Sequence, residues 1–275
     1  MPDPKILISI FAFVFGAVFA SFAGVVAYRV PKGQSIVKPD SFCPACRTPI
    51  KAYDNIPILS WLILGGKCRS CHAKIGVFSL LCEIFGGLGF FSAYWMYGNT
   101  VEELPILIAL LLTVFLFLVM AAIDFETHDI YNITLILFGV IALFVALWRI
   151  FAFGESPWSF VGGAALGFGF FGLVALVSKM LLKRDALGSG DIWLVGIGGL
   201  MLGAFPLLLA ILIATLTGSV IELAKIKLSK QDKESEIAFG PYLLLGMGVM
   251  AIYGNAILDF YWKVVLQCLC TVVPS

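Results

Sequence analysis

Apolar stretches long enough to cross a membrane recur along nearly the whole chain, and they limit the folds open to it. A helix needs about 20 mostly apolar residues to span the roughly 30 Å hydrocarbon core of a bilayer. Stretches of this kind occupy residues 6–28, 76–97, 104–123, 133–153, 158–182, 192–223 and 240–262. The chain is 61% hydrophobic and 13% charged, whereas a soluble domain is about 45–50% apolar and about 25% charged. We therefore expect an all-α polytopic membrane protein surrounded by a lipid bilayer.

The stretch at residues 192–223 is too long for one comfortable crossing and barely long enough for two. Gly203 and Pro206 interrupt it, and these residue types favour a turn. Two short helices here bring the expected number of transmembrane helices to about eight. Lys5 is the only basic residue before the first stretch, whereas a cleavable signal peptide begins with a basic segment. The stretch is also longer than the apolar part of such a signal peptide. We therefore interpret residues 1–28 as an uncleaved first transmembrane helix.

The basic residues predict the orientation, because Lys and Arg beside membrane spans collect on the cytoplasmic side. With eight spans, fifteen Lys and Arg lie on one face and three on the other. This asymmetry predicts both termini outside, a small cytoplasmic loop domain at residues 29–75, and a core of about seven transmembrane helices at 76–275. The formal net charge of +1 offers no basic field for nucleic acid, so no nucleic-acid partner is expected.

Four cysteines in the polar segment have the spacing of a zinc site. Cys43 and Cys46 form one C-x2-C pair, Cys68 and Cys71 form another, and 21 residues separate the pairs. This spacing is typical of four-thiolate zinc ribbons. The alternatives are two redox dithiols or unligated thiols, although a cytosolic location disfavours stable disulfides. Four sulfurs leave no open coordination position, so we expect the metal to fold the loop rather than to catalyse.

Two aspartates lie at membrane-helix ends that the span count puts on the same side. Asp124 follows an apolar run, where the helix dipole opposes a negative charge. Asp191 opens a later helix directly after Gly188 and Gly190, and an alternative interpretation makes it a helix N-terminal cap. Two neighbouring carboxyls share a proton, so one can activate water while the other protonates the leaving group. The pair therefore predicts peptide hydrolysis, with glycine backbone that an extended substrate can approach closely.

Two other classes of protein use membrane acids differently. A proton-coupled transporter would use Asp124, Asp191 and Glu83 as a proton relay. A zinc-stabilised membrane scaffold would use the aspartates only as helix caps. Absence of hydrolysis by the pure protein would favour the transporter. An unchanged phenotype after replacing both aspartates by asparagine would favour the scaffold.

Several segments resemble, in order, the landmarks of the bacterial type IV prepilin peptidases, which are intramembrane aspartic proteases. They lie at residues 24–29 (GVVAYR), 43–46 (CPAC), 53–61 (YDNIPILSW), 65–71 (GGKCRSC), 123–132 (ID, then IYN), 188–194 (GSGDIWL) and 239–243 (FGPYL). The resemblance implies that Asp124 and Asp191 are the catalytic pair and that Gly188 and Gly190 belong to the G-x-G-D motif. It also implies cleavage of the basic leader from prepilins and pseudopilins, after a Gly, at the cytoplasmic face of the bacterial inner membrane.

The same resemblance implies a second activity, N-methylation of the new amino terminus with S-adenosylmethionine as the methyl donor. It ties Gly66 to methyl transfer. Glu83 matches a glutamate that follows the cysteine loop, and we interpret this acid, about two turns into a span, as facing the substrate. The chain departs from the family pattern at residues 77–79, where Arg-Tyr-Pro is usual, and at Tyr131, where Pro is common.

Overall fold

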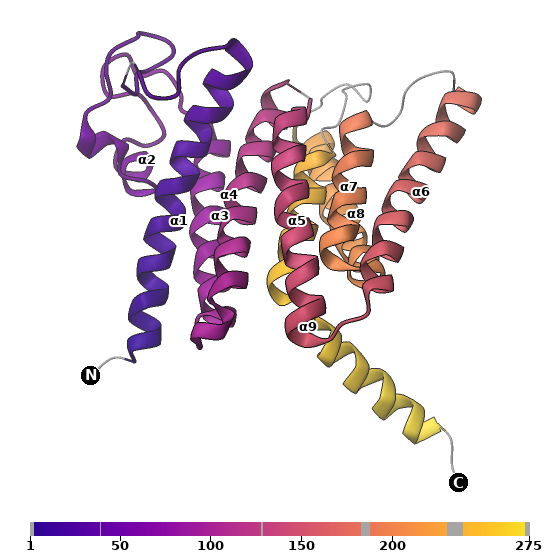
Figure 1. Ribbon diagram of the computed structural model, residues 1–275. Coiled ribbons are helices and arrows are strands. Elements are labelled where there is room, and N and C mark those ends of the chain that lie inside the picture. Colours follow the sequence, from indigo (N-terminus) through magenta and orange to yellow (C-terminus); the bar gives the residue numbers. More distant parts are fainter. Residues whose placement is uncertain (1–2, 39, 128, 183–187, 230–238, 273–275) are drawn as a thin grey trace. The chain divides into compact units, whose positions relative to one another are not determined.

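The computed structural model describes residues 3–38, 40–127, 129–182, 188–229 and 239–272 (Figure 1). Within these ranges the regular elements are helices, accompanied by two isolated β-bridges. In chain order they are α1 (Pro4–Arg29), η1 (Val30–Lys32), η2 (Ala52–Asn55), α2 (Leu59–Ile63), α3 (Val77–Tyr97), η3 (Val101–Glu103), α4 (Leu104–Thr127), α5 (Asn132–Phe153), α6 (Pro157–Leu182), α7 (Ser189–Leu202), α8 (Ala204–Ser229) and α9 (Gly240–Val272).

Among the described residues, seven helices are long and apolar enough to cross a membrane: α1, α3, α4, α5, α6, α8 and α9. This confirms the predicted all-helical polytopic fold. The predicted break in the 192–223 stretch is also confirmed, because Gly203, with φ of 89°, separates α7 from α8. The two pieces are unequal, however. The 14-residue α7 is only about 21 Å long, so the eight expected spans are seven full-length helices and one short helix.

The chain forms two compact units, Met1–Ile130 and Tyr131–Ser275. In the first unit, α1, α3 and α4 pack against one another, and the cysteine loop joins α1 to α3. In the second, α7 packs against α6 and α5, and α8 packs against α9. The division predicted from the sequence, at residues 28 and 75, stays a prediction.

Small residues bring α1 and α3 of the first unit into close contact. A Cβ added at Gly16 would meet the backbone carbonyl of Gly86, and one added at Gly86 would meet Ala20. Small residues at such interfaces let helix backbones approach closely inside a membrane, where packing rather than hydrophobicity drives association. This contact fixes the first half of α3, which carries Glu83, against α1.

In the second unit, glycines likewise bring α6 and α7 into close contact. A Cβ at Gly163 would meet the carbonyl of Gly199, and one at Gly167 would meet the carbonyl of Val195. The backbones of the two helices are therefore in direct contact along most of the short α7. This contact holds the helix that carries Asp191.

The carboxyl end of α7 is bound by an arginine from α5. Arg149 Nη1 donates to the carbonyls of Met201 and Leu202, at 3.4 Å each. The last carbonyls of a helix have no partner within it and carry partial negative charge, so a cation there is favourable. Arg149 also pairs with Glu155, at 2.8 Å, and lies over the ring of Phe160.

Candidate active site and metal centre

The four cysteines of the loop converge on one point. Their sulfur atoms all lie within 4.8 Å of one another, and Cys43 Sγ lies 3.8 Å from Cys71 Sγ. A Zn–S bond of about 2.3 Å gives a tetrahedron with edges of about 3.8 Å. The donor set and its spacing therefore fit a tetrahedral Zn²⁺ held by Cys43, Cys46, Cys68 and Cys71.

Each cysteine pair lies in a turn of the same construction. In the first turn, Cys43 N–H donates to Thr48 O at 3.0 Å and Arg47 N–H donates to Cys43 O at 2.8 Å. In the second, the equivalent bonds run from Cys68 N–H to Ala73 O at 2.8 Å and from His72 N–H to Cys68 O at 3.0 Å. Flanking β-bridges, Phe42 with Pro49 and Lys67 with Lys74, repeat as well. Two equivalent turns thus aim two sulfurs each at one centre.

Hydrogen bonds shift the pKa values of Cys46, Cys68 and Cys71 in different directions. Bonds with the Thr48 side chain and backbone lower the pKa of the Cys46 thiol to about 6. Bonds with the backbone of Cys71 and Ser70 lower the pKa of Cys68. A bond with the Ala73 backbone lowers the pKa of Cys71, but its hydrogen bonds with neighbouring thiols and partial desolvation of its sulfur raise it to about 11. Because zinc binds the thiolate form, Cys46 and Cys68 are poised for metal binding.

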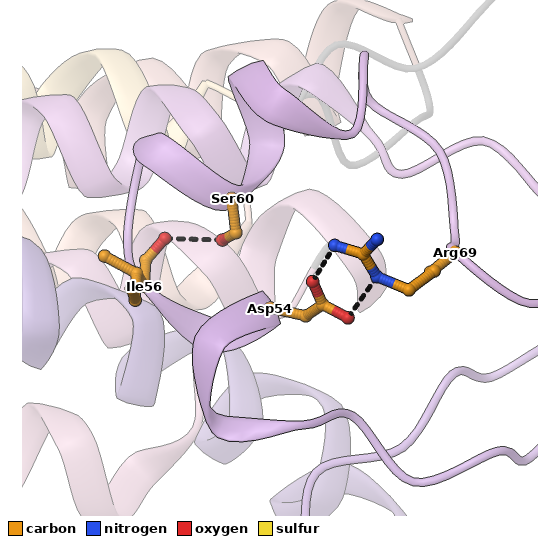
Figure 2. Close-up of polar contacts among 4 residues, drawn as sticks. All are labelled: Asp54, Ile56, Ser60 and Arg69. Carbon is orange, nitrogen blue, oxygen red and sulfur yellow. Dashed lines mark hydrogen bonds and ion pairs between the residues drawn. The ribbon is translucent and has the colours of Figure 1, made fainter.

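A bidentate ion pair joins the second cysteine turn to η2. Arg69, between Cys68 and Cys71, donates from Nε and Nη2 to the two oxygens of Asp54, at 2.8 and 2.6 Å (Figure 2). The side-by-side geometry matches the fork of a guanidinium. The pair lowers the pKa of Asp54, chiefly through the hydrogen bonds from Arg69. Sequence spacing gave no indication of this contact, because the two residues are fifteen positions apart.

Glu83 binds the loop from inside α3. Its side chain is buried, and Oε2 accepts a hydrogen bond from the backbone N–H of Ile58 at 2.7 Å. Ile58 has φ of 64°, which is unfavourable for a β-branched residue. The same turn is closed by Ser60, whose hydroxyl donates to Ile56 O (Figure 2). Glu83 therefore holds a strained turn of the loop against α3, and its predicted substrate-facing role stays a prediction.

Gly66 has a packing role in the same loop. Its φ is 66°, and an added Cβ would meet the ring of Trp61. The Gly66 N–H donates to Trp61 O at 2.9 Å, and its carbonyl accepts from Ile75 N–H at 2.7 Å. Gly65, with φ of 58°, has nothing within 4 Å of its added Cβ. A side chain at Gly66 would therefore collide with Trp61, whereas a side chain at Gly65 would meet open space.

Asp124 lies within α4, three residues before its end, rather than just after it. It is buried, with 6% of its surface exposed. The adjacent Phe125 stacks on Phe78 of α3, with ring centroids 4.0 Å apart and planes 5° apart. This stack fixes the last turn of α4, and thus Asp124, on the first turn of α3.

Asp191 lies in the first turn of α7, in the second unit. The N-cap residue is Gly188, so Asp191 occupies the third helical position and the alternative interpretation as N-cap is wrong. Its Oδ2 would lie 3.5 Å from a Cβ built on Gly188, and its N–H donates to Gly188 O at 3.1 Å. Gly190 is the second residue of the helix. The backbone of Gly188 beside this carboxylate therefore carries no side chain.

Two family models match the chain. Residues 14–97 match the bacterial peptidase A24 N-terminal domain, and residues 110–223 match the type IV leader peptidase family. The first match contains the cysteine loop and Glu83, and the second contains Asp124 and Asp191.

Curated relatives carry the name prepilin leader peptidase/N-methyltransferase. The Bacillus subtilis (strain 168) protein is 30% identical over 254 residues, which cover 92% of this chain and 98% of that protein. The Neisseria gonorrhoeae protein is 32% identical, with 92% of each chain covered. The Myxococcus xanthus (strain DK1622) protein is 38% identical over 216 residues, but the chain covers only 62% of its length. No solved structure matches the chain. The two family matches, together with 30–32% identity over nearly the full length of two relatives, show that the chain belongs to the type IV leader peptidase family, peptidase A24.

Proposed function

We propose that the protein removes the leader peptide of prepilins and pseudopilins by hydrolysing the bond after a Gly at the cytoplasmic membrane face. One observation carries this proposal: Asp191 lies in the first turn of α7, within the G-x-G-D segment of a region that matches the type IV leader peptidase family. Asp124 lies in the same matched region. The names of the relatives support prepilins as the substrate class.

The span count supports a joint role for the two aspartates. Between Asp124 and Asp191 the chain contains two helices long enough to cross a membrane, α5 and α6. Two crossings return the chain to the side from which it started. In the proposed reaction, one carboxylate takes a proton from water as the water oxygen attacks the peptide carbonyl. The other carboxyl gives a proton to the departing amine nitrogen as the C–N bond breaks.

Incubation of the purified full chain with a prepilin, followed by mass spectrometry, tests the proposal. We expect loss of the leader mass, and we expect Asp124→Asn and Asp191→Asn to abolish it. Glu126→Gln is the matched control, because Glu126 lies in the same last turn of α4 but is exposed. Intact prepilin after incubation with well-folded wild-type protein would contradict the proposal and favour the transporter.

We infer the orientation from the charge asymmetry of the loops. It puts the cysteine loop and both aspartates at the cytoplasmic face of the bacterial inner membrane. Reporter fusions after Lys74, Arg184 and Lys233 should all report cytoplasm; Arg184 and Lys233 lie outside the described residues. An external signal from the Lys233 fusion would contradict the count of crossings.

We also propose a structural Zn²⁺ in the four-cysteine centre and N-methylation of the cleaved product. S-adenosylmethionine would supply the methyl group, and the second half of the relatives' name supports this activity. The residue assigned to methyl transfer is Gly66, which packs against Trp61 in the cysteine loop. Transfer of labelled methyl groups to a cleaved prepilin tests this activity separately from cleavage.

A further inference from the structure

The short helix α2 presents an apolar face outside the protein. Leu59, Leu62 and Ile63 expose 56%, 58% and 77% of their surface, and Ile56, just before the helix, exposes 45%. The three helical residues are three and four positions apart, so they share one face. A contiguous apolar face of this kind is unfavourable in water and marks an interaction surface.

The contact between Glu83 and Ile58 sets the depth of α2 relative to the membrane helices. Glu83 is six residues into α3, which is about 9 Å along the axis from its first residue, Val77. Its side chain leans toward the start of the helix and binds the N–H of Ile58, the residue that precedes α2. The beginning of α2 therefore lies below the loop end of α3, at the level of the first two turns of α3. Figure 1 shows α2 beneath the tip of the loop, at the height of the upper half of α1.

The charge of the loop complements a lipid surface. Residues 29–75 contain eight Lys and Arg and two Asp. Of the two acids, Asp54 is paired with Arg69. Basic segments beside a membrane are attracted to its anionic lipids, and helices that lie in the interface bury their apolar face about 5–10 Å into the boundary between headgroups and acyl chains. With Val77 at the membrane boundary, the start of α2 lies in this zone, because Glu83, about 9 Å further along α3, binds Ile58.

We propose that α2 is an interfacial membrane element whose Leu59, Leu62 and Ile63 side chains insert among the acyl chains of the leaflet on the loop side. Glu83 holds the helix at this depth from inside α3, and the exposed lysines of the loop face the lipid headgroups. The cysteine centre would then lie on the bilayer surface rather than above it. This inference is independent of the peptidase reaction.

Photocrosslinking from a single side chain tests the proposal. The full chain, with Ile63 replaced by p-benzoylphenylalanine, is reconstituted alone into vesicles of phosphatidylethanolamine and phosphatidylglycerol. After illumination, lipid adducts are measured by mass spectrometry. Val37 is the matched control, because it is an apolar loop residue of nearly equal exposure, 75%. It lies between Ser35 and Asp40, whose carbonyls accept hydrogen bonds from Arg29 at the loop end of α1. Phe15, in the middle of α1 and 62% exposed, is the positive control.

We expect the probe at Ile63 to give several-fold more lipid adduct than the probe at Val37 and an amount similar to that at Phe15. A second probe at Leu59 should repeat the result, which guards against a local disturbance at Ile63. A yield at both α2 positions as low as at Val37 would overturn the proposal. Crosslinking to a second copy of the chain, or a shift of the adducts from lipid to prepilin when prepilin is added, would assign the face to a protein partner instead.

Discussion

Arg47 and His72 occupy equivalent positions in the two cysteine turns, four residues after the first cysteine of each pair, and both have a left-handed backbone, with φ of 57° and 56°. This conformation costs a residue with a side chain about 1–2 kcal/mol. Such strain persists where the surroundings dictate it. Here the repeated hydrogen bonds and a metal held by both turns would provide that restraint.

The first prediction concerns the metal. Wild-type protein should contain about one equivalent of zinc, and Cys68→Ser should lose it, because three thiolates remain where a closed site needs four. Elemental analysis of the purified proteins measures this. Cys82→Ser is the matched control, since Cys82 lies on α3 outside the cluster. Removal of the metal should increase protease sensitivity within residues 29–75. Full zinc occupancy in Cys68→Ser would exclude this cysteine as a ligand.

The ion pair between Asp54 and Arg69 leads to a pH prediction. Because Arg69 lowers the pKa of Asp54, the pair stabilises the loop above the pKa of the unfolded aspartate. That contribution is lost as the pH falls through the lower folded pKa. Asp54→Asn should therefore speed hydrogen exchange of the loop amides by a similar factor throughout about pH 6–8. Asp40→Asn, which changes the other acid of the loop, should leave exchange unaltered. A difference that vanishes between neutral pH and pH 6 would point to another titrating group.

Replacement of Gly66 should separate the two proposed activities. Gly66→Ala places a methyl group against the ring of Trp61 at a positive φ, whereas Gly65→Ala meets a positive φ but open space. We expect Gly66→Ala to reduce methyl transfer much more than Gly65→Ala does, while leader cleavage persists in both. Methyl transfer and cleavage are measured on the same preparation. Equal loss of both activities in Gly66→Ala would indicate misfolding of the loop rather than a role in methyl transfer.

Arg149 should stabilise the second unit through the end of α7. Arg149→Gln removes the cation that binds the Met201 and Leu202 carbonyls, so we expect a loss of about 1.5–3 kcal/mol in the free energy of unfolding. Glu155→Gln removes only the partly exposed ion pair and should cost about 0–1 kcal/mol. Unfolding in detergent measures both. If the two substitutions cost the same, the stabilisation belongs to the ion pair and not to the helix end.

The aspartates should behave as one catalytic unit. If an acid and a base act together, removal of either one disables the reaction, so the effects of two substitutions do not add. Asp124→Asn, Asp191→Asn and the double variant should all cleave prepilin at a similar residual rate. All three should retain zinc, because neither aspartate belongs to the cysteine cluster. A double variant that is slower than either single variant by the product of their effects would show that the aspartates act independently.

The sequence predicts the membrane helices well because bilayer thickness sets their length. The stretch at 133–153 corresponds to α5, Asn132–Phe153, and that at 76–97 corresponds to α3, Val77–Tyr97. The end of α4 is less predictable. Backbone hydrogen bonds continue to Thr127 although the apolar run stops at Ile123, and Asp124 is consequently buried within the helix.

The contacts of the cysteine loop show where sequence reasoning stops. The spacing of the cysteines predicted the cluster that the structure contains, because a short turn brings both members of a pair together. The equal lengths of the two turns, CPACRT and CRSCHA, would also have predicted their repeated backbone. In contrast, Glu83 and Ile58 are 25 positions apart, and no local pattern links a membrane-helix acid to a strained loop backbone.

The bond from Glu83 to Ile58 also bears on protein engineering. Residues 29–75 resemble a self-contained metal-binding insert that could be grafted between the helices of another membrane protein. Yet the carboxylate that restrains Ile58 comes from α3, outside that segment. A chimera built from the insert alone would leave this backbone turn without its partner, so the smallest transplantable piece includes the first two turns of α3.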